Sequence, residues 1–581
     1  MKKIKLFSTL STALLTVTAV PIVATACTNS KKNTNYNAIF KKEYFDQSST
    51  VYNPSLATFS AYTTYRSETY IIDDDYSQGD KNIKEFLTNY GFENFESNSY
   101  YKTLPGKTTE GVAIATMPIS DNYTLIALVP RSWNYVNEWC GNMMLEAQGR
   151  PYPKKYHAGF YVGAVNMLLF LKDYILRHNL TGNIKIWIPG YSRGAAVSNL
   201  CASIIDEAIE QGKLEEVIGN TTLTHENLFC YTFATPTNVD VSYYEGIDIH
   251  GDTYNNIFNV INPCDAIPYL FPFNMQMDRF GKDKYICSSW IAPEQYKKYV
   301  PEVITDYKDD FDKTYTIDDW TYYSQPGTSS ISTLFKNYNM EFATRYATQL
   351  LGEVAKNRQN YVNLFQGRLV HLFEDIYSRG ELIPTAEDLM DILTLFYEKS
   401  DDDIRLYISF YTLIRNFSAL YDAHIIYNYI GWLKTCDPNY HNSDYELNTL
   451  LDDYKYYKIE TKGFNNVEIW DATKENKLAS FNQNYHYFPW TTDHSDNIAI
   501  GGFWNQLTPN NVITYVQSFL RGFDINDIHI KYRAIISSQI TPIENASITL
   551  YEVTPKKNEV VKEYKLTTLD HSTEWAWLGE E

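Results

Sequence analysis

The chain has 581 residues, of which 44% are hydrophobic, and its formal net charge is -20. This length and apolar content predict a globular protein of two or three domains with large buried cores. The acidic charge argues against the phosphate backbone of a nucleic acid as the main partner, so we expect no nucleic acid among its partners.

The N-terminus has the pattern of an export signal. Three lysines precede an apolar run over residues 6–23, and small residues then lead to Cys27. A cysteine in this place is typical of bacterial lipoproteins, in which cleavage makes it the lipidated N-terminus; an ordinary signal peptide with an incidental cysteine is the alternative. We expect residues 1–26 to be removed as a signal peptide and residues 27–43 to form a tether. The protein would then be held at the cell membrane by lipid, on the extracellular face.

Apolar runs with strand and helix spacing alternate over the first half of the chain. Strands are predicted at residues 123–129, 184–188, 228–233 and 257–261, and helices at 158–177 and about 200–209. Strands that alternate with helices predict a mostly parallel sheet with helices on both faces. We therefore expect an α/β fold with its core over residues 44–272.

The pattern changes after Pro272. Residues 385–396 show a capping box followed by apolar residues on one helical face, so a mostly helical region is predicted over 273–435. Alternation of apolar and polar residues, as in 467–470, predicts a small all-β domain over residues 456–560.

A serine between two glycines follows the strand predicted at residues 184–188. The sequence there is Gly190-Tyr-Ser192-Arg-Gly194, and small residues follow. Serine is a weak nucleophile unless it is placed beside a base, and a sharp strand-to-helix turn lifts it out of the sheet for that purpose. Side chains at the glycine positions would collide with neighbouring backbone in so tight a turn. The pattern predicts a catalytic Ser192; a plain glycine-rich turn is the alternative.

The chain resembles the class 3, fungal-lipase-type branch of the α/β-hydrolases, and in particular bacterial lipase-family lipoproteins with a Gly-Tyr-Ser-Arg-Gly-Ala-Ala elbow. The matching segments occur in the family's order at residues 89–92, 111–114, 131–139, 157–160, 190–196, 231–236 and 258–268. The resemblance implies an α/β-hydrolase core with an inserted helical cap and a serine ester hydrolase acting on acyl esters or lipids. It implies neither a metal nor an organic cofactor.

The resemblance also implies the partners of Ser192. Asp265 follows the strand predicted at 257–261, as the family's triad aspartate does, with Asp240 and Asp248 as alternatives. Chain order does not choose among the histidines after Asp265, which are His371, His424, His441, His486, His494, His529 and His571. The segment around His424 resembles the family's catalytic-histidine segment, although Ile426-Tyr427 replaces the usual Pro-Glu. We expect His424 to be the base, with His494 second.

Acyl transfer also needs backbone amides that face the developing oxyanion. The N–H of Arg193 is the first expected donor because it directly follows the nucleophile. The second is expected at Trp133, in a loop where the family usually has a glycine-rich run. For His157, which precedes the elbow, the resemblance implies a structural role.

The cap inserted between Asp265 and His424 would cover Ser192 and line an acyl-binding wall. A lipase, a short-chain esterase and an acyltransferase would share this chemistry. A catalytically inactive surface lipoprotein that uses the hydrolase scaffold for binding or adhesion is the second hypothesis.

Overall fold

The computed structural model describes residues 37–311, 423–482, 513–514, 528–534, 543–569 and 572–579, apart from short gaps, and residues 371, 374, 375 and 378. The described residues fall into two compact units, one ending at Asp452 and one beginning at Asp453. The predicted signal peptide, Cys27 and most of the predicted tether lie outside the described residues.

The first unit is built on a seven-stranded sheet in the order β1-β2-β3-β4-β5-β7-β9. The strands are β1 (Glu93–Ser97), β2 (Val112–Ser120), β3 (Tyr123–Pro130), β4 (Asn183–Tyr191), β5 (Leu228–Phe233), β7 (Ile257–Ile261) and β9 (Lys282–Tyr285). The first three strands pair antiparallel, whereas β3, β4, β5, β7 and β9 pair parallel. The mostly parallel sheet predicted from the sequence is confirmed.

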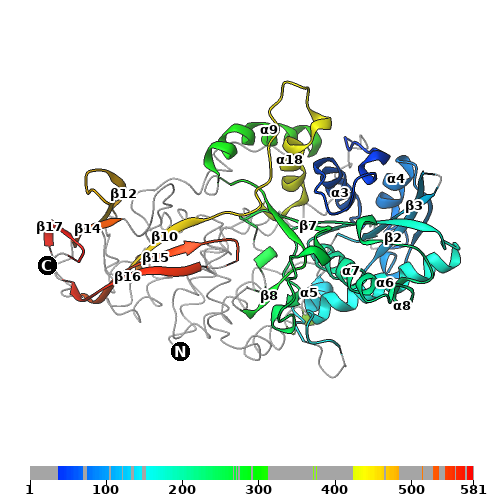
Figure 1. The fold of residues 1–581 in the computed structure, drawn as a ribbon, viewed down its shortest axis with the longest axis horizontal. Helices are drawn as coiled ribbons and strands as arrows, with labels where there is room; N and C mark the ends of the chain where they lie inside the picture. The colour runs from blue at the N-terminus through cyan, green and yellow to red at the C-terminus, as the bar shows by residue number, and fades with distance from the viewer. Residues whose placement is uncertain are drawn as a thin grey trace. The chain divides into compact units, whose positions relative to one another are not determined.

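Side chains alternate between the two faces of this sheet along each strand, and helices bury both faces. In β3, Ile126 and Leu128 belong to one hydrophobic cluster, and Leu125 and Ala127 belong to another. The first cluster includes residues of α6 (Ala158–Arg177) and α7 (Arg193–Glu210). The second includes residues of α3 (Pro54–Arg66), α4 (Lys81–Asn89), α9 (Pro293–Phe311) and α18 (Ile426–Cys436). Figure 1 shows α6 and α7 on one side of the sheet, with α3 and α18 on the other.

The helix α6 begins and ends where the sequence predicts. Within the described ranges it is the one helix long and apolar enough to cross a membrane, but half of its apolar window is buried. Residues such as Met167 and Leu171 pack into the first hydrophobic cluster. This burial is the pattern of a core helix.

Elements after residue 272 belong to the first unit, which is built on the seven-stranded sheet. The strand β9 lies at the edge of the sheet, and α9 and α18 join the cluster around α3. The predicted helix at 385–396 and nearly all of the chain between α9 and α18 lie outside the described residues. The helical cap therefore stays a prediction.

The second unit contains two four-stranded sheets, in the orders β13-β10-β15-β16 and β12-β11-β14-β17. Their strands are β10 (Tyr456–Lys462), β11 (Asn466–Trp470), β12 (Lys477–Asn482), β13 (Ile513–Thr514), β14 (His529–Ala534), β15 (Ile543–Val553), β16 (Asn558–Leu569) and β17 (Ser572–Trp577). Neighbouring strands pair antiparallel. This is the β structure predicted for the end of the chain, and it extends to Trp577.

Candidate active site

Ser192 lies at the turn between β4 and α7, at the carboxyl end of the parallel strands. Its backbone has φ 55° and ψ -124°, a combination that a residue with a side chain rarely adopts. The backbone N–H of Ser192 donates to Phe233 O at 2.9 Å, so the end of β5 holds the turn. A strained residue held by its surroundings is a common feature of active sites.

The two glycines beside Ser192 allow close backbone approach. A Cβ on Gly190 would lie 2.6 Å from Ser198 Oγ and 2.7 Å from Gly194 O. A Cβ on Gly194 would lie 3.0 Å from Arg131 O, which belongs to the loop after β3. Side chains at either position would therefore push apart the turn, the first turn of α7 and that loop, as the sequence predicts.

The structure brings Ser192, His424 and Asp265 together, although they come from three distant parts of the chain. His424 lies two residues before α18, and its Nε2 is 3.0 Å from Ser192 Oγ. Its Nδ1 is 2.9 Å from Asp265 Oδ2. Asp265 is fully buried, whereas 20% of the His424 side chain is exposed. Serine, imidazole and carboxylate therefore form one continuous chain of hydrogen bonds.

Two further donors hold the carboxylate of Asp265. The backbone N–H of Ile267 donates to Oδ1 at 2.9 Å, and the hydroxyl of Tyr429 donates to Oδ2 at 2.7 Å. Tyr429 also accepts from the backbone N–H of Asn262 at 3.2 Å. Burial, together with the charge of Asp265, raises the pKa of Tyr429 well above its ordinary value, so the phenol keeps its proton.

The segment that carries His424 is held by two residues at the carboxyl ends of β4 and β7. The hydroxyl of Tyr191, at the end of β4, donates to His424 O at 2.8 Å, and the two rings stack with centroids 5.1 Å apart. Asn262, after β7, donates through Nδ2 to Ala423 O at 2.9 Å. The sequence does not single out Tyr191, Asn262 or Tyr429, although Tyr191 and Asn262 lie within residues 131–275, which match a known family.

The alternative aspartates occupy turns. Asp240 accepts from Ser242 N at 3.0 Å and caps a short 3-10 turn. Asp248 accepts from His250 N at 2.9 Å. Each side chain thus stabilises its own local turn.

The other downstream histidines in the described part of the chain have different surroundings. His441 Nε2 is 2.8 Å from Lys434 O, and its ring stacks on Tyr445. His371 is exposed and contacts Glu374, and His529 lies in β14 of the second unit. The remaining three, His486, His494 and His571, lie outside the described residues.

Arg193, the first residue of α7, is anchored inside the protein. Its Nη1 donates to Asn142 Oδ1 at 2.8 Å, and its Nε is 3.2 Å from Glu110 Oε2. Burial raises the pKa of Glu110 to about 7, although the charge of Arg193 opposes this rise. Backbone N–H groups in the first turn of a helix have no intrahelical acceptor. The side chain of Arg193 thus fixes the start of α7, the end of the helix next to Ser192.

The second expected oxyanion donor, Trp133, lies outside the described residues. The loop that leads to it begins at Arg131, whose Nη1 donates to Tyr100 O at 2.9 Å and whose Nη2 forms an ion pair with Glu138. Because Arg131 O lies against Gly194, this loop reaches the first turn of α7.

His157 lies at the start of α6 and is fully buried. Its Nδ1 accepts from Phe160 N at 3.4 Å, and its ring packs on Phe160 and Phe271. These contacts are those of a structural residue that caps a helix. Among the described residues, no group of three or more His, Cys, Asp and Glu side chains is arranged to hold a metal ion.

Residues 131–275 match the family model of class 3 lipases. The chain contains a class 3 lipase domain. The matched part of this lipase domain includes Ser192 and Asp265 and ends before His424. The resemblance to class 3 lipases is confirmed, and the lipase domain makes the chain a serine ester hydrolase.

Several solved structures of fungal lipases are similar to parts of the chain. The triacylglyceride lipase of Rhizomucor miehei is 15% identical and superposes with a TM-score of 0.27, covering 41% of this chain and 82% of that lipase. Lipase II of Rhizopus niveus is 17% identical, with a TM-score of 0.23, and covers 30% of this chain and 62% of that lipase. No curated protein matches the sequence.

Proposed function

We propose that the protein hydrolyses acyl esters of lipids through a catalytic triad of Ser192, His424 and Asp265, while anchored to the cell surface through Cys27. The observation that carries the triad is the unbroken series of contacts from Ser192 Oγ through both nitrogens of His424 to Asp265 Oδ2. This is the arrangement that an acyl-transfer nucleophile needs, because the base is within reach of the hydroxyl proton and is itself oriented by a carboxylate.

The reaction begins when Ser192 Oγ attacks the ester carbonyl and His424 Nε2 takes its proton. Asp265 stabilises the imidazolium that forms, since its fully buried carboxylate faces Nδ1. The imidazolium then gives the proton to the leaving alcohol, and an acyl-serine remains. His424 next takes a proton from a water molecule as the water attacks the acyl carbon. The bond from that carbon to Ser192 Oγ then breaks, His424 returns the proton to Oγ, and the acid leaves.

The developing negative charge needs backbone donors beside Ser192. The N–H of Arg193 is one, because it belongs to the first turn of α7 and its side chain is tied down by Asn142 and Glu110. A residue of the loop after β3, at Trp133, is the other. The close approach of Gly194 to Arg131 O supports this choice, since it brings that loop to the same end of α7.

Attachment through Cys27 would keep the enzyme next to its substrate. The basic residues, apolar run and small residues before Cys27 support removal of residues 1–26 and lipidation of the new N-terminus. A lipid anchor concentrates the enzyme at the membrane, where acyl glycerides and phospholipids are found.

The test uses the purified mature protein and p-nitrophenyl esters of short, medium and long acyl chains. We expect Ser192→Ala and His424→Ala to lower kcat by about 1,000-fold or more at the chain length that the protein prefers. His441→Ala is the matched control and should keep the activity of the parent.

Equal turnover in His424→Ala and the parent would remove His424 from the triad, and His494→Ala would then be made. Turnover that does not depend on Ser192 would contradict the proposed mechanism. Absence of any esterase activity in the parent would favour the binding or adhesion protein.

A further inference from the structure

Two turns of the backbone support the proposed triad. The turn after β5 begins at Phe233, whose carbonyl accepts from Ser192 N. The turn after β7 carries Asp265 and continues into the short helix that contains Pro268. The position of Ser192 relative to Asp265 depends on how these two turns are held together.

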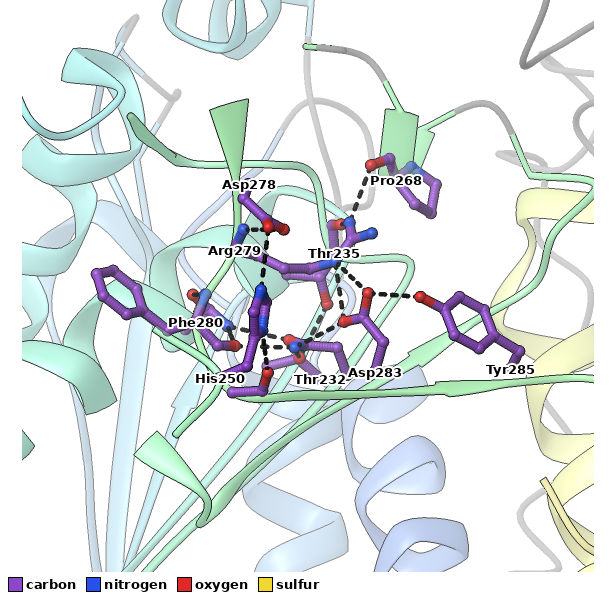
Figure 2. A network of polar contacts seen from close by, with 12 residues as sticks. Thr232, Thr235, His250, Pro268, Asp278, Arg279, Phe280, Asp283 and Tyr285 are labelled. Atoms are coloured by element: carbon purple, nitrogen blue, oxygen red, sulfur yellow. Dashed lines mark hydrogen bonds and ion pairs between the residues drawn. The ribbon is translucent and has the colours of Figure 1, made fainter. Parts of the chain in front are cut away.

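The buried side chain of Arg279 contacts both turns. Figure 2 shows Arg279 between Thr235, Pro268 and Asp283. Its Nη1 donates to Thr235 O, in the turn after β5, and to Pro268 O at 2.9 Å, in the turn after β7. Arg279 is fully buried, so both hydrogen bonds form away from water.

The guanidinium is itself fixed by the edge of the sheet. Its Nε is 3.0 Å and 3.2 Å from the two carboxylate oxygens of Asp283, in β9. The hydroxyl of Tyr285 donates to Asp283 Oδ2 at 2.9 Å, and Nδ2 of Asn259, in β7, donates to Oδ1 at 3.1 Å. A buried carboxylate held in this way neutralises the guanidinium and determines its orientation.

The turn that carries Arg279 has little freedom. It runs from β8 (Met277–Asp278) to β9, and His250 holds it on one side, with Nδ1 2.6 Å from Gly281 O and Nε2 3.0 Å from Asp278 Oδ2. Gly281 has φ 87°, and a Cβ there would lie 2.3 Å from Ile257 O. The backbone of Arg279 is therefore fixed, and so is the origin of its side chain.

We propose that Arg279 is a positioning residue that sets the distance between Asp265 and the Ser192–His424 pair by holding the carbonyls of Thr235 and Pro268. This inference rests on the proposed triad. Arginine suits the task because its planar group donates in several fixed directions, whereas lysine has a single flexible ammonium. Arg279 lies just beyond residues 131–275, the part matched to class 3 lipases.

The test replaces Arg279 with lysine, which keeps the charge beside Asp283 but cannot hold two carbonyls and the carboxylate with the same geometry. Folded sites are counted by titration of the reactive serine with a p-nitrophenyl phosphonate. We expect kcat per titrated site to fall about 10- to 100-fold, with KM changed less than about threefold, because a displacement of about 1 Å costs this much in rate.

The pH dependence separates positioning from a general loss of stability. A looser contact between Asp265 and His424 stabilises the imidazolium less, so the acid limb of kcat/KM should move to lower pH in Arg279→Lys. Arg177→Lys, which alters a partly exposed ion pair with Glu96 at the end of α6, is the control and should keep the parent's kcat and profile.

A parental kcat per site together with an unchanged profile in Arg279→Lys would overturn the inference, while a dead Ser192→Ala would still support the triad. Retained turnover in Ser192→Ala would instead refute the proposed function. If Arg279→Lys yields no folded protein, Tyr285→Phe gives a milder test, since it removes the 2.9 Å hydrogen bond to Asp283. Tyr285→Phe should lower kcat a few-fold and move the acid limb of kcat/KM to lower pH, as in Arg279→Lys. A parental kcat together with an unchanged pH profile would overturn the inference.

Discussion

The hydroxyl of Tyr429 gives a sharp prediction about the acid of the proposed triad. Tyr429→Phe removes the 2.7 Å hydrogen bond to Asp265 Oδ2 and leaves the backbone N–H of Asn262 without this acceptor. A hydrogen bond to a charged group contributes about 1.5–3 kcal/mol and a neutral one about 1 kcal/mol, so the free energy of unfolding should fall by about 2–4 kcal/mol.

The same substitution should change the pH profile in a defined direction. Removing the Tyr429 donor leaves the negative charge of Asp265 with one partner fewer, so the carboxylate interacts more strongly with the imidazolium of His424. The imidazolium is then stabilised more, and the acid limb of kcat/KM should move to higher pH. This direction is opposite to that expected for Arg279→Lys. The value of kcat should stay within about tenfold of the parent because the three proposed triad residues remain.

The assay combines urea unfolding with kcat/KM measured across the pH range of activity. Tyr244→Phe is the matched control: it removes a 2.9 Å hydrogen bond from a buried tyrosine to the carboxylate of Glu207. Glu207 lies in α7, 15 residues after Ser192, which is about 22 Å at the rise of an α-helix. Tyr244→Phe should lower stability but leave the pH profile unchanged. Equal shifts in both variants, or none in Tyr429→Phe, would refute the role assigned to Tyr429.

Three further predictions concern the elbow, a buried carboxyl group and the anchor. Gly190→Ala should lower the free energy of unfolding by about 1–3 kcal/mol and abolish most activity, because the new Cβ meets Ser198 Oγ at 2.6 Å; urea unfolding and the ester assay measure both. The pKa of Glu110 is about 7 in the folded chain and near 4.5 in the unfolded chain. The free energy of unfolding should therefore decline as the pH rises from 4.5 to 7. In Glu110→Gln that decline should be absent when urea unfolding is measured at both ends of this pH range. Cys27→Ser should move the protein from the detergent-rich to the aqueous phase in a two-phase extraction, and an unchanged partition would exclude lipidation at this residue.

The central part of the fold could be predicted from the sequence because the strands are buried on both faces. The runs at 228–233 and 257–261 are apolar except for Thr232 and Asn259, and they form β5 and β7 within the same bounds. The helix at 158–177 was equally clear, since its apolar positions recur along 20 residues. The sequence predicts the turn at Ser192 because a glycine on each side avoids a collision with neighbouring backbone, and this pattern is local.

Other parts depend on contacts that the sequence does not display. The short edge strand β9 is Lys-Asp-Lys-Tyr, whose polar pattern hides its pairing with β7. No local sequence pattern marks Tyr429 or Arg279. Their roles follow only from the tertiary contacts that bring Asp265 and its loop beside them. His424 and Asp265 were proposed from the family resemblance, because chain order alone left several histidines open.

The most direct measurement of the proposed mechanism is the rate and position of covalent labelling by a fluorophosphonate, read by mass spectrometry of the digested protein. We expect the label on Ser192 in the parent. In His424→Ala, labelling of the same residue should be slower by about 1,000-fold or more, because the hydroxyl then lacks its base. A label on another serine, or labelling of Ser192 at the parental rate in His424→Ala, would contradict the triad.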